Sequence, residues 1–224
     1  MCMHEAALDS TIARYGDDHP NVAECYNNIG MVYRVQGEYD EALVQYQKSL
    51  EIRIRVLGPD SPDVATSYNN IGSVYKAQGK YNEALVQLQK SLEIRIRVLG
   101  PDSPSVATSY NNIGAVYKAQ GKHNEALVQH QKSLEINMCV LGCDHQAVAG
   151  SYNNIGIVYS AQRDDENALL QLQKSIEIKI KVLGCDSMEV ATSHNNIGDV
   201  LNRQGDYENA LLQHHKSLEI NLRV

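Results

Sequence analysis

Apolar and polar positions follow a helical period along the chain, and the pattern itself recurs at a fixed interval. The motif Asn-Asn-Ile-Gly occurs five times, always 42 residues apart, and begins at Asn27, Asn69, Asn111, Asn153 and Asn195. The segments 59–100 and 101–142 differ at only seven of their 42 positions. A period of this length is typical of arrays in which each repeat is one supersecondary unit stacked on its neighbours.

Each period predicts two helices. The segment 61–63 reads Ser-Pro-Asp, which is typical of a helix start: a serine cap, proline at the first helical position and an acid in the first turn. This first helix is expected to run to about residue 78 and to end at Gly79, a residue suited to the left-handed conformation that terminates helices. The second helix is expected over 81–99.

A helix pair of this size cannot bury its apolar face alone, so it has to stack on its neighbours. Residues 1–16 align with 43–58 and predict an additional helix over 3–15 that covers the first pair. We therefore expect an all-α fold, a right-handed superhelical solenoid of five helix-turn-helix repeats plus this N-terminal helix, with eleven helices in all. The predicted division is a single array over 1–224, with a capping half-repeat at 1–16 and repeats at 17–58, 59–100, 101–142, 143–184 and 185–224.

The composition agrees with small, repeated cores, because the chain has 13 Tyr but no Phe and no Trp. A net charge of −7 argues against a nucleic-acid partner, whose phosphates need a basic face. No stretch approaches the roughly 20 apolar residues that span a bilayer, so we expect no membrane contact. Five cysteines do not suggest a disulfide framework and suit a reducing compartment, so the expected location is cytoplasmic.

Helical geometry divides the first helix of each pair into two faces, because successive residues are about 100° apart. One stripe, which we expect to be packed, consists of Tyr68, Ile71, Gly72 and Tyr75. Gly72 would let the partner helix approach closely. The opposite face would repeat along the concave surface of the solenoid, and it carries the small or polar residues Thr66, Asn70, Ser73 and Ala77.

The residues now resemble a known family. The spacing of apolar, aromatic and small positions resembles the tetratricopeptide repeat, and it is set by Tyr68, Ile71, Gly72, Tyr75, Gly79, Tyr81 and Ala84. The 42-residue form, with LEIRxxVLGxDxPxVAxxxNNI linking one pair to the next, closely resembles the repeats of kinesin light chains. The resemblance covers essentially the whole chain and implies a protein-interaction scaffold. It departs at Ile71 and Gly72, where kinesin light chains have Leu and Ala.

The second asparagine of each pair is the first candidate for ligand binding. A carboxamide offers both a donor and an acceptor, so a row of them can bond the backbone of an extended peptide. The predicted ladder consists of Asn28, Asn70, Asn112, Asn154 and Asn196, and the resemblance implies the same role. The alternative is that the amides brace adjacent helices, which we expect more of the first asparagine (Asn27, Asn69, Asn111) than of the second.

Arg34, Lys76 and Lys118 would lie on the rim of this groove, one turn beyond the ladder, where later repeats have Ser160 and Asn202. A row of cations favours an acidic partner, because arginine can pair a carboxylate with two bonds. The other predicted peptide contacts are Thr66, Thr108 and Ser73. Small alanines such as Ala77 would leave room for a large apolar anchor of the peptide. The alternative is an ordinary solvated surface.

The predicted function is therefore a scaffold or adaptor that captures a short, extended, acidic peptide motif of another protein. One alternative is a structural or self-associating spacer, because the last helix reaches Val224 without a following Leu-Gly terminator or polar capping helix. That ending favours a longer array, with self-association through the uncapped C-terminal helix as its competitor. Another alternative is a sensor repeat that regulates an absent effector domain.

Other chemistry has little support in the sequence. Cys139, Cys143 and His145 are the nearest approach to a metal cluster, but a structural zinc site needs four ligands. We expect no metal and no cofactor. His130 and His214 fall at a packed position of the second helix and are interpreted as tolerated substitutions. No serine or cysteine has a matching base nearby and no phosphate-binding loop occurs, so we expect no enzymatic activity.

Overall fold

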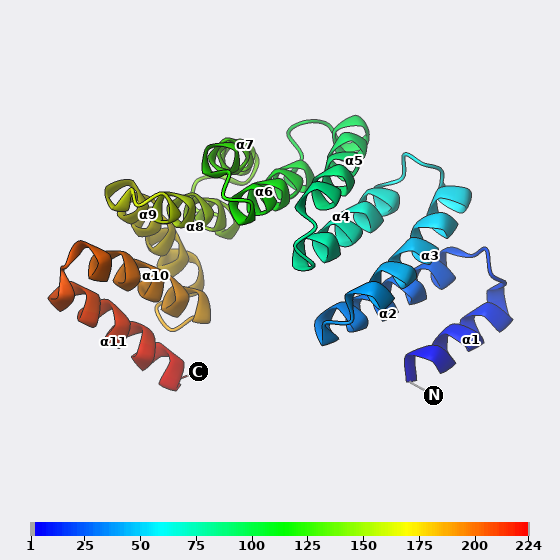
Figure 1. The fold of residues 1–224 in the computed structure, drawn as a ribbon, viewed down its shortest axis with the longest axis horizontal. Helices are drawn as coiled ribbons and strands as arrows, with labels where there is room; N and C mark the ends of the chain where they lie inside the picture. Colours follow the sequence, from blue (N-terminus) through cyan, green and yellow to red (C-terminus); the bar gives the residue numbers. More distant parts are fainter. Residues whose placement is uncertain (1–2, 224) are drawn as a thin grey trace. The chain divides into compact units, whose positions relative to one another are not determined.

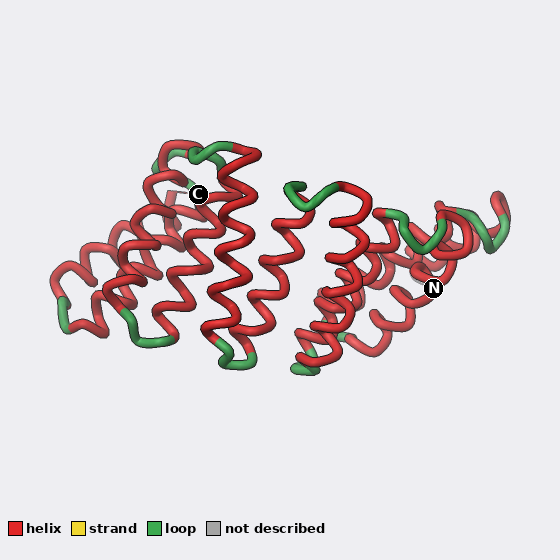
Figure 2. Tube along the Cα trace, turned by 90° about the horizontal axis from the view of Figure 1, so that it is seen from above, coloured by secondary structure: helices red, strands yellow, loops and turns green. Residues whose placement is uncertain are grey.

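In the computed structural model, which describes residues 3–223, all the regular elements are α-helices (Figures 1 and 2). The helices are α1 (Met3–Tyr15), α2 (Pro20–Gln36), α3 (Tyr39–Leu57), α4 (Pro62–Ala77), α5 (Tyr81–Leu99), α6 (Pro104–Ala119), α7 (His123–Leu141), α8 (Gln146–Ala161), α9 (Asp165–Leu183), α10 (Met188–Gln204) and α11 (Tyr207–Arg223). Residues 1–2 and 224, which belong to the predicted capping segment and last repeat, lie outside the described residues. The all-α repeat fold, with one helix followed by five pairs, is confirmed for the described residues.

The chain divides into two compact units, residues 1–116 and 117–224. Unit 1 contains α1 to α5 and most of α6, and unit 2 contains the end of α6 and α7 to α11. Within unit 1, the α2–α3 and α4–α5 hairpins stack through α3 and α4, and α1 covers α2 (Figure 1). Within unit 2, α7 stacks on α8, and the α8–α9 hairpin stacks on α10 of the α10–α11 hairpin. The single array with its repeat boundaries, and its superhelical handedness, stay predictions.

Local signals in the sequence fix the helix ends. Ser61 caps α4 by accepting a hydrogen bond from the Asp63 backbone N–H at 3.2 Å, as its sequence predicts. α4 ends at Ala77, one residue before the expected position, and Gly79 then adopts a left-handed φ of 74°. Arg163 takes the equivalent place in unit 2 with a φ of 65°, which is a costly conformation for a side chain with a Cβ atom.

The helices of each hairpin approach closely because a glycine faces a large side chain. A Cβ atom on Gly72 would lie 2.8 Å from Leu88 Cγ and 3.2 Å from the Ala84 carbonyl oxygen. In unit 2, a Cβ atom on Gly156 would likewise lie 2.8 Å from Leu172 Cγ. The predicted role of Gly72 is therefore confirmed.

Each unit also contains a cation that is half-buried or buried, which the sequence pattern did not reveal. Arg53 Nη1 donates to Ser67 Oγ at 2.9 Å, and Lys179 Nζ donates to Ser193 Oγ at 2.7 Å. In each case the cation lies on a second helix and the serine on the first helix of the following pair. Burial lowers the pKa of both cations. These bonds tie consecutive hairpins together at a fixed register.

Candidate peptide-binding site

The asparagines of successive repeats are hydrogen-bonded to one another. Asn70 Nδ2 donates to Asn27 Oδ1 at 2.8 Å, and Asn112 Nδ2 donates to Asn69 Oδ1 at 2.7 Å. The equivalent bond from Asn196 in unit 2 is 3.1 Å long. The second asparagine is thus part of an inter-repeat brace, which the sequence analysis had expected mainly of the first.

The bond to the preceding repeat involves one hydrogen-bonding group of Asn70 and one of Asn112. A carboxamide has two N–H groups and one carbonyl oxygen, and the bond to the preceding repeat uses one N–H. Asn70 and Asn112 are both half-buried rather than enclosed. The neighbouring amide also fixes the orientation of each of the two side chains.

The remaining predicted contacts differ in exposure and in the hydrogen bonds that they already form. Asn28 is exposed and Asn154 is half-buried. Thr66 Oγ1, Thr108 Oγ1 and Ser73 Oγ each donate to a backbone carbonyl four residues earlier, at distances of 3.1, 3.0 and 3.0 Å. Their hydroxyl hydrogens are therefore used within their own helices, and their oxygens remain as acceptors.

Several of the predicted residues line one cavity of unit 1, with a volume of about 280 Å³. We call it the Arg34–Lys76 pocket, and its walls are Arg34 of α2, Ser73, Lys76 and Ala77 of α4, Leu88 of α5 and Asn112 of α6. Four of these are predicted peptide contacts, and Ala77 is the residue expected to leave room for an anchor. Lys118 lies in unit 2, on the last turn of α6.

The pocket is electropositive, because two of its walls are cationic and none of its lining residues is acidic. Arg34 also forms a side-chain hydrogen bond with Tyr46 of α3, which orients the guanidinium. Burial raises the pKa of the Tyr46 hydroxyl, and this effect outweighs the lowering by Arg34.

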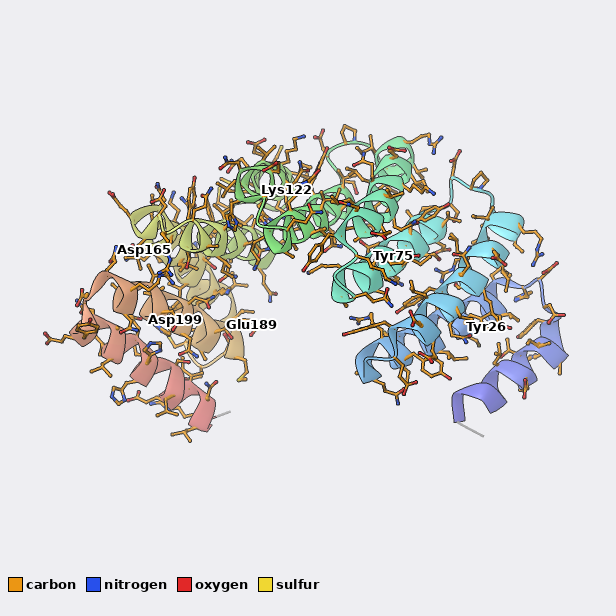
Figure 3. The ribbon with its side chains drawn as sticks, viewed as in Figure 1. Tyr26, Tyr75, Lys122, Asp165, Glu189 and Asp199 are labelled. Atoms are coloured by element: carbon orange, nitrogen blue, oxygen red, sulfur yellow. The ribbon has the colours of Figure 1, made fainter. Side chains whose placement is uncertain are left out.

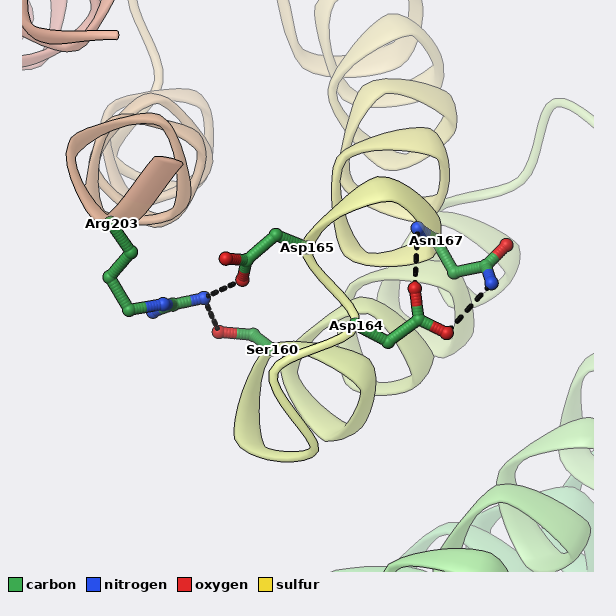
Figure 4. A network of polar contacts seen from close by, with 5 residues as sticks. All are labelled: Ser160, Asp164, Asp165, Asn167 and Arg203. Atoms are coloured by element: carbon green, nitrogen blue, oxygen red, sulfur yellow. Dashed lines mark hydrogen bonds and ion pairs between the residues drawn. The ribbon is translucent and has the colours of Figure 1, made fainter. Parts of the chain in front are cut away.

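Unit 2 arranges the equivalent positions differently (Figure 4). Arg203, which corresponds to Ala77 in the 42-residue register, donates from Nη2 to Ser160 Oγ at 2.7 Å and to Asp165 Oδ1 at 2.5 Å. The exposed fraction of the side chain is 26% for Arg203 and 17% for Asp165, so this ion pair is largely shielded from water. The cation of unit 2 is thus neutralised by the chain's own carboxylate.

Two larger cavities recur at another equivalent position, one in each unit. The cavity of unit 1 measures about 380 Å³ and is lined by Leu43, Val44, Gln47, Lys48, Ile71 and Tyr75, the last labelled in Figure 3. Its counterpart in unit 2 measures about 430 Å³, between α7 and α8. Each combines three aliphatic side chains and a tyrosine with a glutamine and a lysine, and neither lining contains a predicted peptide contact.

The cysteines and histidines considered in the sequence analysis lie in helix caps, on the surface or in the packed core. His145 Nδ1 accepts from the Ala147 backbone N–H at 3.1 Å and so caps α8, while Cys139 and Cys143 are exposed. Between residues 3 and 223, no three or more histidine, cysteine, aspartate or glutamate side chains gather as metal ligands would. His130 is buried, with 2% of its surface exposed, as predicted for a packed position. His214 is only partly buried.

Comparison with family models identifies the repeat. The model described as tetratricopeptide repeat matches residues 3–53, 26–95, 63–138 and 148–223. The chain belongs to the tetratricopeptide-repeat family. The resemblance noted in the sequence is therefore confirmed, and the family supports a role as a protein-interaction scaffold. No curated protein sequence matches the chain.

Solved tetratricopeptide-like structures share the fold. BtubC (BKLC) from P. vanneervenii has a TM-score of 0.82 and 19% identity, over 100% of this chain and 92% of that one. A putative kinesin light chain of Podosopora anserina with nearly identical repeats has a TM-score of 0.75 and 20% identity, over 92% and 97%. A Rap protein complexed with Competence and Sporulation Factor has a TM-score of 0.74 and 15% identity, over 88% of this chain and 53% of that one.

None of the tetratricopeptide helices in the described part of the chain is long and apolar enough to cross a membrane. Repeat arrays of this type are typically scaffolds rather than enzymes, and the candidate site offers contacts for binding rather than a nucleophile with its base.

Proposed function

We propose that this tetratricopeptide array is an adaptor that captures a short, extended, acidic peptide segment of another protein along the face formed by its first helices. The Arg34–Lys76 pocket is the observation that carries the proposal. It gathers Arg34, Ser73, Lys76 and Asn112 around one cavity of about 280 Å³, although these residues come from three different helices.

In this mechanism, some residues of the array bond the backbone of the peptide and others contact its side chains. Asn70 and Asn112 each keep one N–H and the carbonyl oxygen, which can bond the backbone of an extended peptide whatever its sequence. Arg34 and Lys76 would pair with acidic side chains of the partner. Ala77 and Leu88 provide an apolar wall for one larger side chain.

The matched variants Asn70→Ala and Asn27→Ala separate this mechanism from simple bracing. Both remove the 2.8 Å inter-repeat bond, but only Asn70→Ala removes the amide that would meet the peptide. We expect Asn70→Ala to weaken capture of an acidic peptide about 10-fold, the effect of one lost hydrogen bond to a buried partner, and Asn27→Ala to weaken it much less.

The measurement is calorimetric titration of peptides selected from an array of acidic sequences with and without an aromatic residue. Equal losses in the Asn70→Ala and Asn27→Ala variants would mean that the ladder only braces the repeats. Unchanged capture in Lys76→Glu would remove the case for an acidic partner.

Self-association is a second candidate function, favoured by one face of α11. Leu218 exposes 53% of its surface, whereas Leu50 and Leu92, at the equivalent position of earlier repeats, expose only 4%, and Leu222 exposes 78%. An apolar face of this kind can pair with a second copy. Sedimentation velocity at several protein concentrations tests it, because a chain that remains monomeric at high micromolar concentration does not act as a self-associating spacer.

We propose the cytoplasm as the place where the adaptor works. Cys25, Cys139, Cys143 and Cys185 are free thiols, and three of them are exposed. Exposed thiols persist in a reducing compartment and become oxidised outside it. Fractionation of cells that express a tagged full chain tests the location directly.

A further inference from the structure

α1 packs on α2 as a second helix packs on the first helix of the next hairpin. Leu8 and Ile12 of α1 pack against Val22 of α2. Their equivalents in the 42-residue register are Leu50 and Ile54 of α3, which join the apolar cluster that α3 forms with α4. The contact from α1 to α2 therefore repeats the contact by which consecutive hairpins stack within each unit (Figure 1).

α1 is a shorter version of such a second helix. It contains 13 residues, whereas α3 contains 19. Tyr39 and Leu43 at the start of α3 also pack against the cluster with α4, and residues 3–15 contain no counterpart of either. α1 therefore makes only part of the contact that a complete second helix makes with the next hairpin.

The bond that sets the register between hairpins is also weaker at α1. Asn137 Nδ2 of α7 donates to Ser151 Oγ at 3.3 Å, at the position where Arg53 bonds Ser67 in unit 1. In α1 and α2 the equivalent pair is Thr11 and Cys25, in which the thiol donates to the hydroxyl at 3.6 Å. A thiol is a weak donor, so this bond holds α1 less firmly than its equivalents hold the later helices.

α11 presents the full set of contacts of which α1 has only a part. All four of its residues at the positions of Tyr39, Leu43, Leu50 and Ile54 are exposed, and they are Tyr207, Leu211, Leu218 and Leu222. Asn221, at the position of Asn137, is exposed as well. An exposed apolar row with a polar residue in register has the form of a stacking surface without its next hairpin.

We propose that α11 of one copy docks on α2 of a second copy in the place of α1, so that the array continues head to tail across molecules. The inference deepens the second candidate function, on which it rests, because it names the surface that α11 meets and makes α1 a cap that detaches first. The occupant is a second copy because α11 matches α2 in the register that already joins α3 to α4. The contact joins two unlike faces, so it yields open chains of molecules rather than closed pairs.

The asparagine ladder would continue through the same contact. Inside unit 1, Asn70 and Asn27 are half-buried and joined by a bond of 2.8 Å. Asn28 and Asn195 stand at the equivalent positions of the two ends, and both are exposed. In the proposed contact Asn28 Nδ2 of one copy donates to Asn195 Oδ1 of the other. That oxygen also contacts His214 Nδ1 at 3.1 Å, and a carbonyl oxygen can accept two bonds.

A second polar pair follows the same register. Gln78 Nε2 of α4 donates to Asp40 Oδ1 of α3 at 2.8 Å. The equivalent positions at the two ends of the array are Gln36 and Glu208, and both side chains are exposed. An amide and a carboxylate are matched donor and acceptor, so head-to-tail stacking would reproduce this bond between molecules.

The first test locks the cap in the full chain. Thr11→Cys places a second thiol beside native Cys25, because the two side chains are already in contact at 3.6 Å. The background carries serine at the four other cysteines, which are Cys2, Cys139, Cys143 and Cys185. Thiol titration verifies the disulfide, and sedimentation velocity compares the oxidised and reduced forms over a series of concentrations. We expect the oxidised form to stay monomeric at high micromolar concentration and the reduced form to grow beyond a dimer.

The second test loosens the cap without a disulfide. Leu8→Lys with Ile12→Lys removes the apolar contacts of α1, so a larger fraction of α2 faces is open and the apparent dissociation constant should fall about 10-fold. Ala7→Lys with Ala13→Lys adds the same charge on exposed positions of α1 and should leave it unchanged. Adding Leu218→Lys and Leu222→Lys to the loosened chain should abolish the assembly, and assembly that survives would overturn the inference.

Mixing identifies the two surfaces. The oxidised, locked chain offers only α11, and the loosened chain with Leu218→Lys and Leu222→Lys offers only α2. Neither should associate alone, and together they should form a one-to-one complex. If they do not combine, or if the locked chain pairs with itself, α11 meets some surface other than α2 and the inference is wrong.

The inference and the function on which it rests fail in different ways. Equal assembly of the oxidised and reduced forms would leave self-association standing and refute the exchange of α1 for α11. If neither the reduced chain nor the loosened chain associates at high micromolar concentration, self-association itself is contradicted. Capture of acidic peptides is measured separately and does not depend on either result.

Discussion

At equivalent positions of the repeat, unit 1 places Arg34 and Ala77 on successive first helices, whereas unit 2 has Ser160 and Arg203 there. The arginine therefore lies on the earlier helix of the two in unit 1 and on the later helix in unit 2. In unit 2 it meets Asp165 of the same unit, a residue labelled on α9 in Figure 3, and the ion pair occupies the space beside Ser160. In unit 1 the position of Asp165 is held by Tyr39, and a cavity remains.

The difference shows how near-identical repeats can acquire different roles. Both units are built from helix hairpins held by a close glycine approach, such as Gly72 to Leu88 and Gly156 to Leu172, whereas a few side chains decide what the surface offers. Unit 1 presents positive charge and space, which suit a ligand. In unit 2 the arginine instead forms an ion pair with Asp165 of the same unit, which can stabilise the fold.

Charge reversal in unit 1 should have the largest effect. Replacing both Arg34 and Lys76 by Glu should reduce capture of an acidic peptide by roughly 1,000-fold, because two attractions become two repulsions. The matched double variant of unit 2, Ser160→Glu with Asn202→Glu, should change capture by less than about 3-fold. Calorimetric titration measures both, and equal losses in the two units would contradict the comparison.

A buried histidine should make unit 2 sensitive to acid. His130 stands where unit 1 has Tyr46 and Leu88, and burial, with a smaller contribution from the Lys118 charge, lowers its pKa to about 4 from the ordinary 6.5. The unfolded chain therefore takes up the proton first as the pH falls. The stability due to neutral His130 is complete above about pH 6.5 and is lost progressively down to about pH 4.

The variant His130→Leu, which copies Leu88, removes this titration. Between pH 7 and 4 the wild type should lose about 3 kcal/mol of unfolding free energy relative to the variant, as the cited shift in pKa implies. Urea denaturation at a series of pH values measures the difference. A difference independent of pH would show that His130 is not buried in its neutral form.

Breaking the internal ion pair of unit 2 should have a moderate effect. Arg203→Ala copies the alanine found in three other repeats and leaves Asp165 with one partner fewer, which should lower the unfolding free energy by about 1 kcal/mol. The double variant with Asp165→Asn should cost little more, because the two residues act as one pair. If the losses of unfolding free energy from Arg203→Ala and Asp165→Asn simply added up in the double variant, the two side chains would not be coupled.

Relaxing one turn of unit 2 should have the smallest effect. Arg163 has a φ of 65° at a place where the other hairpins have glycine, so Arg163→Gly should raise the unfolding free energy by about 1 kcal/mol. Gly121→Ala, at a φ of 76°, is the matched control and should lower it by a similar amount. Thermal unfolding of the two variants measures both changes, and a shift in the same direction in both would be unexpected.

Much of the fold could be predicted from the sequence because its signals are local and repeated. The 42-residue period sets the number of hairpins, and cap residues such as Ser61 and Gly79 set the helix ends to within a residue. Gly72 could be identified because it recurs opposite a large side chain. Each of these features depends on neighbours within one repeat.

Features that depend on pairs of side chains in different repeats were not predicted. Arg53 lies in an alternating run of isoleucine and arginine that resembles a solvated face, but it is half-buried and bonds Ser67 in the next hairpin. The bond between Asn70 and Asn27 could be predicted only as an alternative to peptide binding, because it depends on the distance between successive helices. The pocket residues could be named from helical geometry, but the neutralisation of Arg203 by Asp165 could not.

The most direct test of the account is to map where an acidic peptide binds on the ¹⁵N-labelled full chain. The account predicts that backbone amide shifts centre on Ser73, Lys76, Ala77 and Asn112, and that Leu88→Tyr removes them by filling the cavity while keeping both cations. Shifts centred on α11 or on the surroundings of Arg203, or shifts that persist unchanged in Leu88→Tyr, would contradict the claim that unit 1 holds the binding site.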